Sequence, residues 1–108
     1  MATSFKNYLV PNIGITATTV YLPTASGIQS TAIGLTLANT LTTSITASVT
    51  LVSAGVTVYI VKNSPIPAGN ALSLLGDGKI IIEANDYIQV QSSAASSIDA
   101  LISVVEVI

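Results

Sequence analysis

The chain has 108 residues, a formal net charge of −2 and charged side chains at only 7% of its positions. It contains no His, Cys, Arg or Trp, so the usual catalytic bases, soft metal ligands and phosphate-gripping side chains are missing. This composition excludes disulfide cross-links and argues against catalysis and metal binding. We expect one domain that is not an enzyme and that holds no cofactor and no metal.

The scarcity of charge also restricts the partners. Nucleic-acid binding relies on clustered basic residues, whereas Lys6, Lys62 and Lys79 lie far apart in the sequence. The apolar runs are short, such as 80–82, and a transmembrane helix needs about 20 apolar residues. We therefore expect no nucleic acid, no membrane and no small-molecule substrate as a partner.

The surface of this chain must be unusually poor in charge. A soluble monomer usually carries about 25–35% charged residues on its surface, and half of this chain is hydrophobic. Exposed apolar area of this kind usually marks a surface that another molecule covers. We expect the chain to be a subunit of an assembly.

Apolar and polar residues alternate with a period of two through most of the chain, and β-branched residues dominate these stretches. Turn residues separate the stretches every 8–12 residues or so, as in all-β proteins. The pattern predicts an all-β fold, either a single antiparallel β-sandwich or a jelly-roll-like barrel of about eight short strands. The predicted strands are 16–22, 31–38, 44–52, 56–62, 70–75, 79–83, 87–92 and 98–107.

Residues 1–15 are predicted to form an N-terminal arm or an irregular first strand, ahead of a β-sandwich domain at 16–108. Alternation is weak in this first segment, and Pro11 interrupts it. An arm of this kind can dock on its own sandwich or on a neighbouring subunit. The candidate interface residues are Phe5, Lys6, Tyr8, Leu9, Val10 and Ile13.

Three tyrosines, Tyr21, Tyr59 and Tyr87, fall on predicted strands. A strand tyrosine often covers the rim of a sandwich with its hydroxyl group in water, and we favour that position for these three. The alternative is that they anchor an interface, since tyrosine is enriched at binding surfaces.

Prolines and aspartates between the later strands predict turns. Pro65 and Pro67 cannot donate hydrogen bonds to a sheet, so we expect a turn over 63–70. Asp77 and Asp86 also lie in turn segments, where a carboxylate bonds to nearby backbone N–H groups. The spacing of the acidic residues is not that of a calcium loop.

Two segments are apolar on both faces of a predicted strand: residues 80–82, and the last strand, where Leu101, Val105 and Val107 lie on the opposite face from Ile102, Val104 and Ile108. Residues 80–82 are three consecutive isoleucines, so at least one of them faces outward. Such a strand is either buried between two layers or lies at a subunit interface. On the second reading, the residues of an oligomer seam are Ile81, Leu101, Val105 and Val107.

Several motifs together give the chain a recognisable pattern. They are the opening Met-Ala-Thr-Ser-Phe-Lys-Asn-Tyr and the segments 12–14, 17–21, 32–39, 59–69, 79–86 and 88–90. The pattern resembles small β-rich virion structural proteins of tailed bacteriophages, particularly cyanophages. Where Asn85 stands, the resemblance leads us to expect Gly, and Asn also tolerates a left-handed backbone.

The resemblance implies a capsid decoration, or cement, protein. Such a protein binds the outside of the phage head at capsomer junctions and stabilises the shell. The implied partners are the major capsid protein and further copies of the chain in a homotrimer. The implied location is the outer surface of the head in the virion, after assembly in the host cytoplasm.

Two other functions stay open at this point. A neck, tail, baseplate or head-fibre-base subunit would differ in symmetry and copy number, which the sequence does not reveal. A host- or glycan-binding β-sandwich module would call for exposed aromatic residues, and the chain has one Phe and four Tyr.

Overall fold

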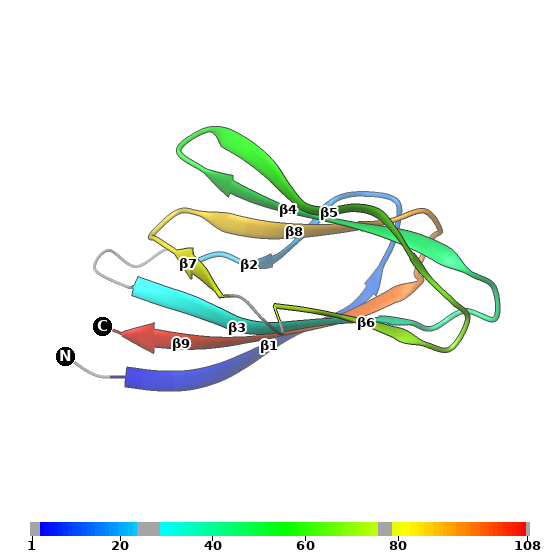
Figure 1. The fold of residues 1–108 in the computed structure, drawn as a ribbon, viewed down its shortest axis with the longest axis horizontal. Helices are drawn as coiled ribbons and strands as arrows, with labels where there is room; N and C mark the ends of the chain where they lie inside the picture. The colour runs from blue at the N-terminus through cyan, green and yellow to red at the C-terminus, as the bar shows by residue number, and fades with distance from the viewer. Residues whose placement is uncertain (1–2, 24–28, 76–78, 108) are drawn as a thin grey trace.

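The computed structural model describes residues 3–23, 29–75 and 79–107, and these residues form a two-layered antiparallel β-sandwich (Figure 1). The strands of this described part are β1 (Thr3–Ile13), β2 (Thr18–Tyr21), β3 (Gln29–Asn39), β4 (Ile45–Ser53), β5 (Val56–Ile66), β6 (Ala71–Leu74), β7 (Ile80–Ile82), β8 (Tyr87–Ser92) and β9 (Ile98–Val107). The predicted all-β class is confirmed. Within the same ranges, no helix is long and apolar enough to cross a membrane.

The strands form two sheets that face each other across the core (Figure 1). The first sheet has the order β1-β9-β3-β6, and the second has the order β2-β8-β4-β5. Strand β6 pairs with one half of β3 and β7 pairs with the other half. The two short strands therefore share one position in the sheet, and the eight positions have the two-sheet arrangement of a jelly roll.

The core lies between the sheets and follows from the alternation in the sequence. In β9, every second residue from Ile98 to Val104 is buried, and β3 contributes Leu35 and Leu37 in the same way. Side chains of successive strand residues point to opposite faces, so one face of each strand can be apolar and buried. The largest fully buried side chains also include Ile13, Ile66, Ile82, Ile88, Val49 and Val90.

Strand β5 corrects the turn that we predicted over 63–70. The strand continues through Pro65 to Ile66, and the turn begins at Pro67, whose carbonyl accepts a bond from the Asn70 N–H at 3.1 Å. Pro65 is tolerated because β5 is the edge strand of the second sheet, and proline lacks the N–H that a central strand needs.

The N-terminal segment forms strand β1, which pairs with β9 from Thr3 to Val10. The register shifts between Val10 and Ile13, and Asn12 adopts a left-handed backbone with φ 57°. The chain then crosses to the second sheet at Gly14, where a Cβ atom would lie 3.1 Å from the Ser96 nitrogen. The division into residues 1–15 and 16–108 stays a prediction, although β1 is an integral strand of the first sheet here.

Two neighbouring isoleucines in β7 test this arrangement. Ile82 is fully buried, whereas Ile81 is 70% exposed. We expect Ile82→Ala to lower the free energy of unfolding by about 2–5 kcal/mol because it leaves a cavity in the core. Ile81→Ala should cost the isolated subunit less than about 1 kcal/mol. Urea unfolding of both variants measures the difference, and equal losses would contradict the register of β7.

Candidate functional site

A carboxylate is buried at one end of the sandwich. Glu106 lies on β9 in register with Ser30 of β3, and it is only 4% exposed. Its neighbours on the same strand face, Ile102 and Val104, belong to the core. A buried carboxylate is costly unless it is hydrogen-bonded or paired with a positive charge.

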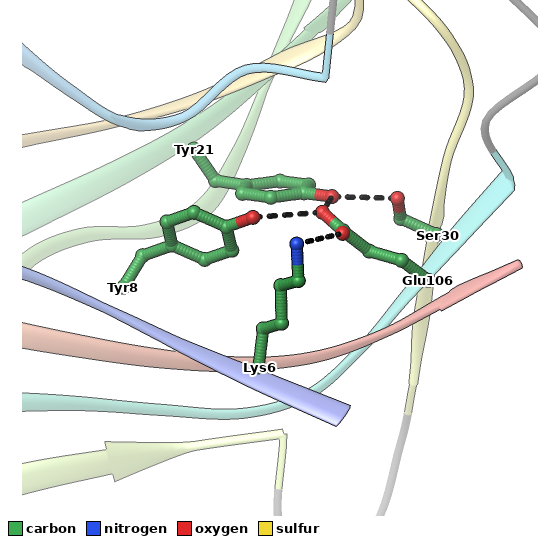
Figure 2. A network of polar contacts seen from close by, with 5 residues as sticks. All are labelled: Lys6, Tyr8, Tyr21, Ser30 and Glu106. Carbon is green, nitrogen blue, oxygen red and sulfur yellow. Dashed lines mark hydrogen bonds and ion pairs between the residues drawn. The ribbon is translucent and has the colours of Figure 1, made fainter. Parts of the chain in front are cut away.

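Three donors from two strands satisfy this carboxylate (Figure 2). The hydroxyl groups of Tyr8 and Tyr21 donate to the same carboxylate oxygen, at 2.9 and 2.6 Å. The Lys6 ammonium lies 3.4 Å from the other oxygen. Because the single Tyr21 proton points to Glu106, the Ser30 hydroxyl donates to the Tyr21 oxygen at 2.6 Å. We call Lys6, Tyr8, Tyr21, Ser30 and Glu106 the carboxylate network.

The carboxylate network joins the two sheets and fixes the edge strand. Tyr21 comes from β2 in the second sheet, and its ring packs against the Tyr8 ring of β1 with centroids 5.0 Å apart. Lys6 and Tyr8 are two residues apart, so they reach Glu106 from the same face of β1. A slip of β1 by one residue would turn both side chains away and leave Glu106 without them.

The pKa values of the network follow from this geometry. Burial alone would raise the pKa of Glu106, but the hydrogen bonds from Tyr21 and Tyr8, with the bond and charge of Lys6, hold it below its ordinary value. Burial and the bond to Glu106 raise the pKa of Tyr21 far above its ordinary value, and the same causes raise the pKa of Tyr8. The network is thus a neutral tyrosine pair around an ionised carboxylate at neutral pH.

The outward face of the first sheet is apolar. Phe5 of β1 pairs with Val105 of β9, which pairs with Thr31 of β3, which pairs with Ile81 of β7. Paired residues of neighbouring strands point to the same side, so these four side chains form one row across the sheet. The two ends of the row are the most open, since Phe5 is 79% and Ile81 70% exposed.

Further apolar side chains extend the row to a patch. We call the apolar face the set of outward-facing residues Phe5, Leu9, Ile33, Ile81, Leu101, Val105 and Val107. Among the described strand residues that face outward on this sheet, the charged one is Asp99, at the β9 end remote from Val107. Glu83, which follows β7, lies at the border of the patch.

Two shallow hollows shape the apolar face. One, of about 260 Å³, lies over Ser103 between Phe5 and Ile33. The other, of about 480 Å³, lies over Thr31 between Ile81 and Val107. The apolar face is therefore uneven, and apolar side chains of another molecule can fit into its hollows.

The structure divides the predicted interface residues between two sides of β1. Phe5 and Leu9 point outward, whereas Lys6 and Tyr8 belong to the carboxylate network. Val10 packs against the core, and Ile13 is 1% exposed, so it has almost no surface to offer a partner. The predicted seam residues Ile81, Leu101, Val105 and Val107 all lie on the apolar face, together with Phe5 and Leu9.

Sequence reasoning missed the role of three network residues, Tyr21, Ser30 and Glu106. We placed the Tyr21 hydroxyl in water at the rim, but Tyr21 is 4% exposed and bonds to Glu106 and Ser30. The signal was present in β9, where Glu106 shares the strand face of Ile102 and Val104 and must therefore point inward.

The other acidic residues act locally. The Asp86 carboxylate accepts a bond from the Glu83 N–H at 3.0 Å, as expected for a turn aspartate, and Asn85 is left-handed with φ 72°. Asp77 lies outside the described residues. Within the described ranges, no three acidic side chains come together as a metal site would require.

Comparisons with known proteins define the fold more than the function. A scan against protein-family models and a search of curated proteins both find no match. Among solved structures, a chain of Bacillus endospore appendages, described as a novel family of disulfide-linked pili, aligns with a TM-score of 0.57 and 16% identity. The alignment covers 96% of this chain and 86% of that one. This likeness shows a shared fold.

A second solved structure aligns more weakly. It is a chain of infectious bursal disease virus, Gx strain, with a TM-score of 0.44 and 12% identity, over 95% of this chain and 29% of that one. A TM-score this low supports no conclusion about the fold or the function of this chain.

The lowered pKa of Glu106 makes stability depend on pH. A carboxylate of this kind stabilises the fold above its unfolded pKa of about 4.3 and loses that contribution as pH falls through its folded pKa. We expect Glu106→Gln to cost about 1–3 kcal/mol at neutral pH, because bonds to a charged acceptor become bonds to a neutral one. The difference from the wild type should shrink between about pH 5 and pH 3.

Thermal unfolding at a series of pH values measures this effect. Glu83→Gln is the matched control, since Glu83 is exposed and the chemical change is the same. A difference between wild type and Glu106→Gln that stays constant across the acidic range would contradict an ionised, network-bound Glu106.

Proposed function

We propose that the chain is a non-enzymatic structural subunit of a virion, a decoration protein on the outer surface of a phage head. It would bind the major capsid protein at capsomer junctions and hold the shell together. The observation that carries the proposal is the apolar face, which presents exposed Phe5, Leu9 and Ile81 on one side of the first sheet. The sequence resemblance to tailed-phage virion proteins is the reason for proposing a phage particle as the assembly.

The apolar face is wide enough for two separate contacts. Phe5 and Ile81 lie at opposite ends of a row that spans four strands, so they are roughly 14 Å apart at about 4.8 Å per strand. We propose that the β1 end, with Phe5 and Leu9, contacts the capsid. The β7 end, with Ile81, would contact another copy in a homotrimer.

Low charge fits a subunit that sits among many copies. Assembly on a repetitive shell places like subunits close together, and like charges across such contacts would oppose it. Hydrophobic contact needs no charge and contributes in proportion to the apolar area that it removes from water. For contact with its neighbours, the chain therefore offers apolar area on the apolar face and not charged groups.

A neck, tail, baseplate or head-fibre-base subunit is the second candidate. The likeness in fold to a pilus protein along nearly the whole chain is the observation that favours a linear or axial assembly. This chain has no cysteine, so an assembly of that kind would be held without the disulfides of those pili.

Copy number separates the two candidates. Quantitative mass spectrometry of purified particles would give the ratio of this chain to the major capsid protein. We expect hundreds of copies in a simple ratio for a decoration protein. A few copies, in a multiple of six, would place it in the neck, tail or baseplate, and its absence from particles would contradict both.

Threonine substitutions at the two ends of the row separate the two contacts. Threonine is a β-branched residue that suits a strand, and it removes apolar area at either position. Ile81→Thr should weaken the trimer by about 10–100-fold, since burial of an isoleucine contributes about 1.5–3 kcal/mol. Phe5→Thr should leave the trimer intact and lower the occupancy on particles. Light scattering gives the mass, and particle binding gives the occupancy.

Val56→Thr is the matched control for both variants. Val56 is 63% exposed, like Ile81, but it lies at the tip of the β4–β5 hairpin, away from the apolar face. If Ile81→Thr and Phe5→Thr behave as Val56→Thr does, the apolar face is not the assembly surface.

A further inference from the structure

The outward face of the second sheet differs in kind from the apolar face. Thr19 of β2, Gln89 of β8, Thr50 of β4 and Tyr59 of β5 form a row across the sheet. The next positions along β4 and β8 are Ser48 and Gln91, which pair with each other. Neutral hydroxyl and amide groups thus surround one exposed aromatic ring, since Tyr59 is 55% exposed.

Two hollows on this face meet at the aromatic ring. One, of about 250 Å³, is lined by Lys62, Asn63 and Ser93 among others, and the second, of about 180 Å³, extends toward Thr50 and Ala17. Both are lined by Ser48, Tyr59 and Gln91, so they lie next to each other, and we call the two hollows together the groove.

A bulge in the β4–β5 pair shapes the groove. The register between the two strands shifts on both sides of Val49, which pairs with Val61. The left-handed Asn63, with φ 51°, lies opposite Ser48. The Asn63 N–H donates to the Ser48 hydroxyl at 3.0 Å, which holds this distorted segment in place. β-Bulges often occur where a side chain is redirected next to a binding site.

The polar side chains of the groove are held in fixed orientations. The Gln91 amide donates to the Ile15 carbonyl at 2.8 Å, and the Gln89 amide donates to Thr19 at 3.3 Å. Both bonds use the NH₂ group and leave the amide oxygen as an acceptor. Side chains that are already ordered lose less entropy when a ligand binds.

The aromatic ring is also oriented. The Lys62 ammonium lies 5.0 Å from the centroid of the Tyr59 ring, in cation–π contact range. Lys62 lines one of the two hollows and not the other, so it sits on one side of Tyr59. The side toward Thr50 and Gln89 is left for a ligand to stack on.

We propose that this groove binds a neutral oligosaccharide. A sugar ring carries hydroxyl groups around its edge and C–H groups on its faces. The hydroxyls match the amide oxygens and the Ser and Thr hydroxyls, and a C–H face matches the Tyr59 ring. The lining carries one charge, Lys62, which already interacts with Tyr59, so no anionic group of the ligand is required.

This proposal is independent of the decoration role, because the groove and the apolar face lie on opposite sheets. The test is an NMR titration of the ¹⁵N-labelled chain with chitotriose, cellotriose, mannotriose and sialyllactose at millimolar concentration. We expect a neutral trisaccharide to shift the backbone resonances of Ser48, Tyr59 and Gln91. Tyr59→Ala should weaken this binding about tenfold, the effect of losing an aromatic contact.

Two further variants make the result specific. Tyr59→Phe keeps the stacking surface and should retain binding, which separates loss of the ring from loss of the fold. Tyr87→Ala removes a tyrosine from the same sheet that lines neither hollow, and it should bind as the wild type does. No shift with any neutral probe, binding of sialyllactose alone, or equal binding by wild type and Tyr59→Ala would overturn the proposal.

Discussion

The buried carboxylate of Glu106 is the constraint on which the arrangement of this molecule depends. It draws Lys6 and Tyr8 of the edge strand and Tyr21 of the opposite sheet to one point. Together with the buried Ile13, this network fixes the register of an edge strand whose alternation is weak. Once the inward side of β1 is fixed, Phe5 and Leu9 must point outward, so a polar network inside the sandwich creates the apolar surface outside it.

The two outer faces of the sandwich have opposite chemistry. The first sheet presents Phe5, Leu9 and Ile81, whereas the second presents Thr, Ser and Gln side chains around Tyr59. A monomer would gain nothing from gathering Phe5, Leu9, Ile33 and Ile81 on one face. A subunit that is fixed to a surface through one face and meets solvent with the other has a physical reason for this division.

The sequence predicts local structure better than it predicts which distant segments meet. The alternation of Leu35 and Leu37 with polar neighbours predicts β3, because a half-buried strand needs only its own period. Strand β1 stayed ambiguous because its partner β9 is at the other end of the chain. That Phe5 and Ile81 share a face depends on the order β1-β9-β3-β7, which no local pattern contains. Pro65 led to the wrong turn prediction because a proline is tolerated in an edge strand, and whether a strand lies at an edge depends on the whole sheet.

The most direct measurement of the central claim uses the absence of native cysteine. Thr31→Cys places a thiol at the centre of the apolar face, and Thr50→Cys places one at the equivalent position of the second sheet. Maleimide labelling of each variant would be compared between purified particles and dissociated subunits. The account predicts that assembly protects the thiol of Thr31→Cys and leaves that of Thr50→Cys reactive. Equal labelling of Thr31→Cys in both states would contradict it.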